Sequence, residues 1–367
     1  MHRVGSSPPS TPVHVLTTIS VANPVGVAVH SATNRIYVFN HGDEIHPSTV
    51  TVIDGNTNSI TATVEVGLYP TGAIAANSTT NKIYVPNGTN SMIVIDGATN
   101  STQSTSVSTG SSVCPIAVDP AINRVYLICG STSELTVIDG ATNNVSIIPV
   151  ATSSYFDSPS HIAVNSAIHD VYVSNASRGG STEDIKIDGT TLQTSAVALN
   201  GVGPSICDVA VNPRTNKIYV SAGELLAIMD GKTLSSQTMT IGDYEGLIAV
   251  NAATNKLYCR SKESAGSQDS VTVMDGSSLA TSVVPTGQYP ASIVVDEGID
   301  QTYVVNRDSG TVTVIDGASN ATTTLPAGYS PENAALNPLT HRLYVTSFSA
   351  DVSGGPNGTL TVIDGPH

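Results

Sequence analysis

The sequence predicts an all-β protein, a single eight-bladed β-propeller, on the basis of two repeated features and one absence. A Val-Ile-Asp-Gly segment or a near copy recurs at intervals of 41 to 49 residues and ends at Gly55, Gly97, Gly140, Gly189, Gly231, Gly276, Gly317 and Gly365. A second repeated feature is a Tyr-Val pair or variant, with its tyrosine at Tyr37, Tyr84, Tyr126, Tyr172, Tyr219, Tyr258, Tyr303 and Tyr344. No stretch has helical periodicity, and a self-similar period of this length is typical of a repeat architecture.

Each repeat predicts four strands, named a to d from the centre of the ring outward. In the second repeat we expect them at residues 72–76, 82–85, 91–96 and 101–107, where Val, Ile and Leu alternate with small polar residues. We expect each Asp-Gly to make a tight hairpin turn between strands c and d. Four antiparallel strands per repeat, joined by hairpins and arranged in a ring, form a propeller blade.

The two ends of the chain predict how the ring closes. Residues 14–21 resemble a strand d without its own a, b and c, and the last repeat ends at Asp364-Gly365 without a strand d. We therefore expect the N-terminal strand to complete the last blade, which leaves no open edge. The predicted organisation is an N-terminal extension at residues 1–12 and one propeller at 13–367.

Composition restricts the partners. Only 12% of the 367 residues are charged, and the acidic net charge of −15 repels nucleic acid and anionic lipid. No run of 18 apolar residues exists, so we expect no membrane insertion. Residues 1–12 contain no apolar leader segment. The Ser/Thr/Asn-rich, Lys-poor composition favours an extracellular or cell-surface protein whose leader is not present in this sequence; a cytosolic protein is the alternative.

The repeats resemble those of the YVTN-family β-propellers. The resemblance rests on the Tyr-Val strand, the Val-Ile-Asp-Gly strand and the proline before strand a, and it covers about residues 13–365. The asparagine of the family motif is kept at Asn40, Asn87, Asn175 and Asn306. The resemblance implies a secreted or cell-surface propeller of unassigned role. Many family members have seven blades, whereas this sequence predicts eight.

The predicted loops fall on two rims. The a–b and c–d turns share one rim, where repeated Asp, Lys and Arg indicate turn chemistry with weak exposed ion pairs, or alternatively a charged docking ring. The d–a and b–c loops share the other rim, and the b–c loops are long in blades one, four, six and eight. We expect binding residues on this second rim. All eight aromatic residues outside the repeat tyrosines are predicted to lie in its loops: Tyr69, Tyr155, Tyr244, Tyr289, Tyr329, Phe39, Phe156 and Phe348.

The preferred functional hypothesis is that this rim binds a small molecule, a glycan or a protein. Aromatic faces suit sugar rings, cations and protein anchors. The candidate ligand-binding residues are Tyr69, Tyr155, Phe156, Tyr244, Tyr289, Tyr329, His41 and Arg307. A structural alternative for Tyr69 and Tyr289 is that each packs the joint between two blades.

An enzyme is the rival hypothesis. The side chains of His161, Asp208, Glu245 and Glu332 come near the start of strand a, where they could meet at the channel mouth. Such a set could hold a divalent cation such as Ca²⁺, and a metal-assisted lyase or hydrolase would then use His161, Glu245 and Glu332 as catalytic candidates. Ordinary solvated loop charges are the alternative.

The four cysteines include one candidate pair. If Val118 lies opposite Val125 in the a–b hairpin of blade three, counting outward places Cys114 opposite Cys129. We therefore predict a cross-strand disulfide in an oxidising compartment. Cys207 and Cys259 have no such partner, and we expect them to be buried thiols.

Overall fold

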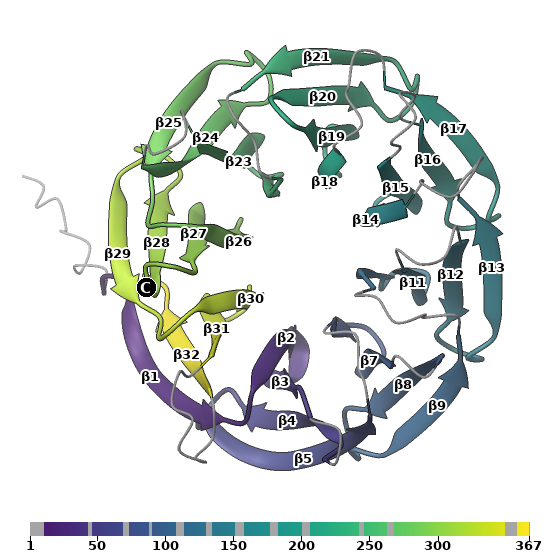
Figure 1. Cartoon of the computed structure of the whole chain (residues 1–367), viewed down its shortest axis with the longest axis vertical. Coiled ribbons are helices and arrows are strands. Elements are labelled where there is room, and N and C mark those ends of the chain that lie inside the picture. The colour runs from purple at the N-terminus through teal and green to yellow at the C-terminus, as the bar shows by residue number, and fades with distance from the viewer. Residues whose placement is uncertain are drawn as a thin grey trace, which may run out of the picture.

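Each predicted repeat forms one antiparallel four-stranded sheet, and the eight sheets stand in a closed ring in the computed structural model (Figure 1). The eight-bladed prediction is therefore confirmed. The structure describes residues 11–42, 46–68, 73–87, 90–107, 114–129, 134–150, 158–176, 183–199, 206–241, 246–262, 268–348 and 358–366.

The first four blades follow one another along the chain. Blade one contains β2 (Pro24–His30), β3 (Arg35–Asn40), β4 (Ser48–Asp54) and β5 (Ser59–Gly67), with a short 3-10 turn η1 (Ser31–Thr33). Blade two contains β6 (Ala75–Asn77), β7 (Lys82–Asn87), β8 (Ser91–Asp96) and β9 (Thr102–Ser106). Blade three contains β10 (Ile116–Asp119), β11 (Arg124–Ile128), β12 (Glu134–Asp139) and β13 (Val145–Pro149). Blade four contains β14 (Ser158–Asn165), β15 (Asp170–Ala176), β16 (Glu183–Asp188) and β17 (Thr194–Ala198).

The remaining blades complete the ring. Blade five contains β18 (Ile206–Asn212), β19 (Lys217–Ala222), β20 (Leu225–Asp230) and β21 (Ser236–Thr240). Blade six contains β22 (Ile248–Asn251), β23 (Lys256–Lys262), β24 (Asp269–Asp275) and β25 (Thr281–Pro285). Blade seven contains β26 (Pro290–Asp296), β27 (Gln301–Asn306), β28 (Thr311–Asp316) and β29 (Thr322–Pro326). Blade eight contains β30 (Pro331–Asn337), β31 (Arg342–Phe348), β32 (Gly358–Asp364) and β1 (His14–Val21).

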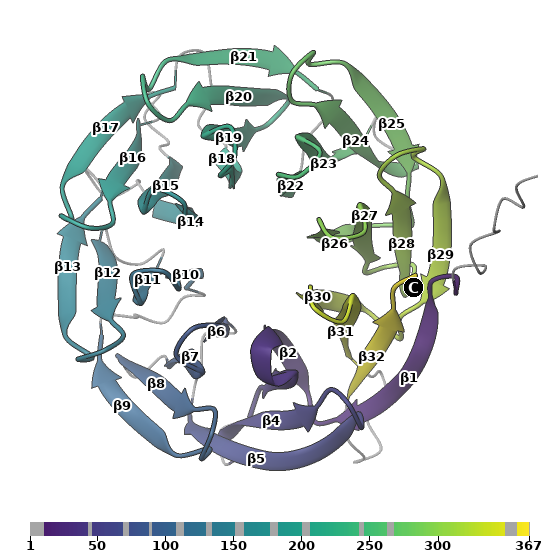
Figure 2. The same ribbon diagram turned by 180° about the vertical axis from the view of Figure 1, so that it is seen from behind.

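The N-terminal strand closes the ring as predicted. Strand β1 pairs antiparallel with β32, from His14 opposite Asp364 to Val21 opposite Gly358. Figure 1 shows purple β1 along the outside of yellow β32, and Figure 2 shows the same closure from behind. The first and last segments of the chain are thus joined by backbone hydrogen bonds in one sheet. Among the described residues, no helix is long and apolar enough to cross a membrane.

The core lies between neighbouring blades. Tyr37 of strand b is fully buried and packs in one cluster with Ile83 and Val85 of the next blade. Phe39 belongs to the same cluster and is 0% exposed. The expectation that Phe39 lies in a rim loop is therefore wrong, because strand b extends through Asn40 and carries this ring into the core. Phe348 also lies in a strand, as the last residue of β31, but it remains exposed.

The Asp-Gly segments turn differently from the prediction. Asp54 is followed by a four-residue turn in which the Asn58 N–H donates to the Asp54 carbonyl at 2.7 Å, with Asn58 left-handed. The Asp54 carboxylate also accepts the N–H groups of Asn56 and Thr57, which lowers its pKa. Gly55 is required for close approach, because a Cβ there would lie 2.4 Å from the side chain of Asn34.

Seven cations of the a–b/c–d rim join neighbouring blades. Each of the seven donates to the carbonyl of the Asp-Gly glycine in the next blade, an arrangement found in the pairs Arg35–Gly97, Lys82–Gly140, Arg124–Gly189, Lys186–Gly231, Lys217–Gly276, Lys256–Gly317 and Arg342–Gly55. Gln301 of blade seven occupies the corresponding position and donates to Asp316 of its own blade instead. The expected exposed ion pairs are thus mainly contacts between blades.

A second set of polar contacts runs beside these cations. The last residue of strand a meets the left-handed residue of the next blade's a–b turn. The asparagine pairs are Asn77–Asn123, Asn165–Asn216, Asn212–Asn255 and Asn337–Asn34, at 2.7 to 2.9 Å. At the corresponding places Asp119 meets His169, and Asp296 meets His341, each at 2.9 Å. This rim is therefore occupied by contacts that hold the ring together.

Candidate functional site

The strongest candidate site lies on the opposite rim, where blades seven and eight meet. Its walls are the b–c turn at residues 307–310 and the d–a link at residues 328–330. The Ala327 N–H donates to the Gly310 carbonyl at 2.9 Å, which joins the two walls. A Cβ on Gly310 would lie 2.6 Å from the Gly328 carbonyl oxygen, so glycine is what allows the walls to approach.

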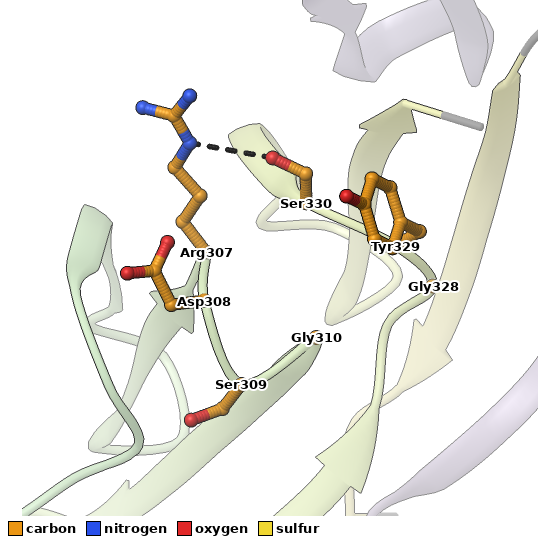
Figure 3. Close-up of a pocket in the computed structure, with 7 residues that line it drawn as sticks. All are labelled: Arg307, Asp308, Ser309, Gly310, Gly328, Tyr329 and Ser330. Carbon is orange, nitrogen blue, oxygen red and sulfur yellow. Dashed lines mark hydrogen bonds between the residues drawn. The ribbon is translucent and has the colours of Figure 1, made fainter. Parts of the chain in front are cut away.

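A hollow of about 510 Å³ opens between these walls. We call it the blade 7–8 hollow, and it is lined by Arg307, Asp308, Ser309, Gly310, Gly328, Tyr329 and Ser330 (Figure 3). The Tyr329 side chain is 64% exposed and provides the aromatic ring of the lining. The Arg307 Nε donates to Ser330 Oγ at 3.3 Å across the hollow. The lining thus combines one aromatic face with several hydrogen-bonding groups.

An arginine–tyrosine cluster continues from the hollow towards blade six; it consists of Arg260, Tyr289, Arg307 and Glu332. The Arg260 guanidinium lies 4.4 Å from the centre of the Tyr289 ring, and that of Arg307 lies 5.6 Å from it. Arg307 also pairs with Glu332, with its Nε 3.3 Å from Oε1. Cation–π contacts of this kind hold the arginine side chains in place.

The conformation of Tyr289 is set by the link between the blades. Its φ is +54°, and it precedes Pro290, where a left-handed conformation is unusual for a bulky residue. Its N–H donates to the Asp269 carboxylate at 2.7 Å, and its carbonyl accepts the Arg307 N–H at 2.9 Å. Two hydrogen bonds therefore stabilise the strained residue and leave its ring on the rim, 40% exposed.

A β-bulge after the proline of strand a determines which side chains reach the channel. The pairing of strands a and b shifts between Pro331 and Asn333, so Glu332 is the extra residue. The same shift occurs between Pro159 and His161 and between Ile206 and Asp208. A β-bulge of this kind changes the direction in which the neighbouring side chains point. Glu332 therefore lies in the arginine–tyrosine cluster on the rim, whereas the residues that follow the three bulges line the channel.

The channel cavity has a volume of about 260 Å³. It is lined by Gly26, Val27, Ala73, Ile74, Pro115, Ile116, His161, Ile162, Asp208, Asn333 and Ala334. Asp208 Oδ2 accepts the Ile248 N–H of blade six at 2.9 Å, and Oδ1 accepts the N–H of Val209 at 2.8 Å. Two ionisable side chains from neighbouring blades therefore line one cavity.

Burial changes the ionisation of both side chains. It raises the pKa of Asp208 to about 7, although the two backbone N–H donors oppose this shift. It lowers the pKa of His161 to about 4. At neutral pH the imidazole is uncharged, and the carboxyl group is close to its midpoint of titration. Groups with pKa values shifted in this way can act as general acids or bases.

The structure separates the predicted site residues into two groups. Tyr289, Tyr329, Arg307 and Glu332 gather at blades seven and eight, whereas His161 and Asp208 line the channel. His41 lies apart, in blade one, where its N–H donates to the Asn23 carbonyl at 2.9 Å, as Arg307 does to Tyr289. The other predicted residues lie outside the described part of the chain: Tyr69, Tyr155, Phe156, Tyr244 and Glu245.

The structure does not bring Glu332 together with His161 and Asp208 in the channel cavity. The Glu332 carboxylate pairs with Arg307 at the rim, because the bulge places it before the channel-lining Asn333. Within the described ranges, no group of three or more His, Cys, Asp or Glu side chains is placed to hold a metal ion. A calcium ion at the channel mouth stays a prediction, with His161 and Asp208 as the described candidates.

The cysteines lie as the register argument requires. Val118 pairs with Val125, and Cys114 and Cys129 are joined by a disulfide with their Cα atoms 4.3 Å apart. Both are buried in the hydrophobic cluster between blades two and three. Cys259 is a buried free thiol, and burial raises its pKa. The side chain of Cys207 lies outside the described residues.

Sequence reasoning favoured the long b–c loops, whereas the blade 7–8 hollow forms at a turn of four residues. The contributions of Ser309, Ser330 and Asn333 were not predicted. One signal was available in the d–a links. Two of them read Gly-X-Tyr-Pro, at residues 67–70 and 287–290, whereas the link at 328–331 reads Gly-Tyr-Ser-Pro. In the last of these links the tyrosine therefore stands one residue earlier in the sequence, directly after the glycine.

Comparisons with known proteins support the fold. No protein-family model matches the chain. The uncharacterized protein YncE of Salmonella typhi is 24% identical over 264 residues, which cover 68% of this chain and 72% of YncE. The same identity and coverage apply to YncE of Salmonella typhimurium strain LT2. The chain is thus a distant homologue of a repeat-containing propeller, and membership of the YVTN family stays a prediction.

Solved structures show the same architecture at low identity. The structure of the Dos1 propeller has a TM-score of 0.72 at 10% identity, with 96% of this chain and 95% of that chain covered. BamB from Moraxella catarrhalis has a TM-score of 0.69 at 12% identity, with coverages of 96% and 99%. Hydrazine synthase from Kuenenia stuttgartiensis has a TM-score of 0.58 at 16% identity, with coverages of 90% and 94%. At these identities the likeness concerns the fold alone.

Proposed function

We propose that this chain is a binding propeller that holds a ligand or protein partner on its d–a/b–c rim, at blades seven and eight. The observation that carries the proposal is the contrast between the two rims. On the a–b/c–d rim the repeated cations and asparagines join neighbouring blades. On the other rim, Tyr329 and Tyr289 stay exposed beside a preformed hollow. Pockets that combine an aromatic surface with a few placed polar groups are typical binding sites.

The test is a binding screen with matched variants. Wild-type protein would be screened by calorimetry and ligand-observed NMR against small molecules, oligosaccharides and peptides. Every hit would be repeated with the double variant Arg307→Ala/Tyr329→Ala. The control is Arg214→Ala/Leu339→Ala on the opposite rim, where the two side chains are 65% and 69% exposed. It removes one arginine and one exposed apolar side chain, as the test variant does.

The outcomes are distinct. We expect the rim variant to weaken binding by at least about tenfold, or about 1.4 kcal/mol, and the control to bind like wild type. Unchanged melting temperatures would show that both variants are folded. Compounds that still bind the rim variant but no longer bind the control variant would place the binding site on the other rim. The repeated cations of the opposite rim do not serve as controls. Lys82 and Arg342, for example, each hold neighbouring blades together, so replacing them would also disturb the fold.

We also propose that the protein works outside the cell or on its surface. A disulfide between Cys114 and Cys129 is compatible with an oxidising compartment. Alkylation of the protein in its source cells before lysis, followed by mass spectrometry, tests this. Modification of both cysteines by the alkylating reagent would contradict the proposal.

The channel cavity supports a second candidate function, a lyase or hydrolase. The supporting observation is that His161 and Asp208, with pKa values of about 4 and about 7, line one cavity. An Asp208 carboxyl near its midpoint at neutral pH is suited to transfer a proton. Turnover of esters, lactones and polysaccharides would be measured with and without added Ca²⁺, using His161→Gln and Asp208→Asn. Activity that both variants retain would exclude this site.

A further inference from the structure

We infer that the ligand of the blade 7–8 hollow is the neutral sugar ring of a glycan. This inference rests on the proposed rim-binding function and adds the chemical class of the ligand. Its basis is the kind of group that lines the hollow. Among the described residues, the lining contains hydroxyl, carboxylate and guanidinium groups, two glycines and one aromatic ring, and no aliphatic side chain. An apolar anchor of a protein partner would meet the Tyr329 ring there but none of the described aliphatic side chains.

A sugar ring has the complementary properties. Its C–H face is weakly apolar and can lie on an aromatic ring, while its hydroxyls point outward from the ring edge. Tyr329 is the exposed ring, and it lies across the hollow from Arg307 and Asp308 (Figure 3). The volume of about 510 Å³ is within the range of small-ligand sites. One face of the ligand would therefore stack while its edge forms hydrogen bonds.

The polar groups of the hollow supply both donors and acceptors. The Arg307 Nε is held by Ser330 and Glu332, and no hydrogen bond to another described residue is made by its two terminal nitrogens. Those nitrogens are fixed in direction and able to donate. Asp308 also lines the hollow; its carboxylate points away from Tyr329 in Figure 3 and can accept from hydroxyls on that side of a ligand. Ser309 Oγ accepts the Gln288 N–H at 2.6 Å, which leaves its own O–H to donate.

The charge balance favours a neutral ligand over an anionic one. Arg307 is already paired with Glu332 at 3.3 Å, and Asp308 adds a second negative charge to the hollow. The net charge of the whole chain is −15. An acidic sugar would meet both the local carboxylates and the long-range repulsion. Neighbouring hydroxyls of a neutral ring can use the same donors and acceptors without an electrostatic penalty.

The decisive experiment compares neutral and acidic glycans on one protein. Oligomers of glucose, galactose, mannose and N-acetylglucosamine would be tested by ligand-observed NMR and calorimetry, beside oligomers of glucuronate and galacturonate. We expect at least one neutral series to bind and the uronates to bind more weakly. Tyr329→Ala should weaken binding by about tenfold or more, whereas Tyr329→Phe, which keeps the ring, should stay within about threefold of wild type.

Two further variants test the polar edge. Asp308→Asn and Arg307→Ala should each weaken binding, and the folded control Arg214→Ala/Leu339→Ala should not. The inference is overturned if no neutral glycan binds folded protein at about 10 mM, if uronates bind better, or if Tyr329→Ala has no effect. Peptide or other small-molecule binding that needs Arg307 and Tyr329 would overturn the sugar ligand and leave the proposed rim function standing. Glycan binding independent of both residues would overturn both.

Discussion

The carboxylate of Asp208 in blade five accepts the backbone N–H of Ile248 in blade six at 2.9 Å. A side chain that lines the channel therefore also joins two neighbouring sheets. Because burial raises the pKa of this carboxyl group to about 7, its ionisation is linked to folding.

The first prediction concerns stability as a function of pH. From pH 4 to 7 the folded state keeps the Asp208 proton that the unfolded chain has released, so this group's contribution to the free energy of unfolding falls as the pH rises. His161 acts in the opposite direction, because its pKa is lowered from 6.5 to about 4 and only the unfolded chain binds its proton in that window. The contribution is on the order of 4 kcal/mol for Asp208 and 3 kcal/mol for His161.

Single variants should separate the two contributions. Relative to wild type, Asp208→Asn should gain stability as the pH rises from about 4 to 7, and His161→Gln should lose stability from about 4 to 6.5. Urea denaturation of the three proteins across this range measures both differences. If the three curves of unfolding free energy against pH ran parallel, the linkage of these groups to folding would be disproved.

The second prediction concerns the closing strand. Deleting residues 1–22 removes β1 and exposes the edge of β32, together with the hydrophobic cluster that contains Val21, Leu360 and Val362. We expect the melting temperature to fall by several degrees or more and aggregation to rise. Deletion of residues 1–10 alone, which leaves β1 intact, is the control. Equal melting and light-scattering curves for the two deletions would refute the role of β1.

The third prediction concerns Cys114 and Cys129. Their disulfide closes a loop with a sequence separation of 15, which corresponds to about 3 kcal/mol of stability in the chain-entropy model. Oxidised protein denatured without reductant should show two free thiols, from Cys207 and Cys259. The variant Cys114→Ser/Cys129→Ser should have a lower melting temperature, whereas reductant should not change it further. A count of four thiols would argue against the disulfide.

The fourth prediction concerns the contacts between blades. Lys217 Nζ donates to the Gly276 carbonyl at 3.1 Å, so Lys217→Met should lower the free energy of unfolding by about 1 to 2 kcal/mol. Lys232→Met, in an exposed c–d turn, is the matched control and should have little effect. Chemical denaturation of both variants measures the difference. Similar values for the two would show that the contact contributes nothing.

The fifth prediction uses the interface between blades seven and eight, where none of the described cations donates to the Asp-Gly glycine carbonyl. Gln301 in blade seven occupies the position that Lys217 has in blade five, since each begins strand b and pairs with the aspartate of strand c. Gln301→Lys should reach the Gly365 carbonyl of blade eight and stabilise the protein by about 1 kcal/mol. Gln301→Met, which has a long side chain without the donor, is the control. If Gln301→Lys were no more stable than wild type and Gln301→Met, the new lysine would not make the predicted contact with the Gly365 carbonyl.

Much of the fold could be predicted from the sequence because each blade is specified by nearby residues. In blade two, Tyr84 pairs with Val94, two residues before Asp96. The repeat tyrosine has the same partner position, two residues before the Asp-Gly aspartate, around the ring, although the loop between strands b and c varies in length. The pairing of residues 14–21 with the last strand followed from counting strands. The disulfide position followed from the register of one hairpin. All of these depend on local periodicity, which a sequence displays directly.

The candidate site depends on contacts between blades, which no local pattern displays. Glu332 reaches Arg307 because a bulge shifts strand a, and Tyr289 lies between two arginines that come from different blades. Phe39 is buried because strand b continues two residues beyond the predicted Tyr-Val pair. The sequence by itself determined the blades, their number and their closure. Only the tertiary structure decided which rim side chains pair across blades and where a hollow remains, because packing between sheets sets those distances.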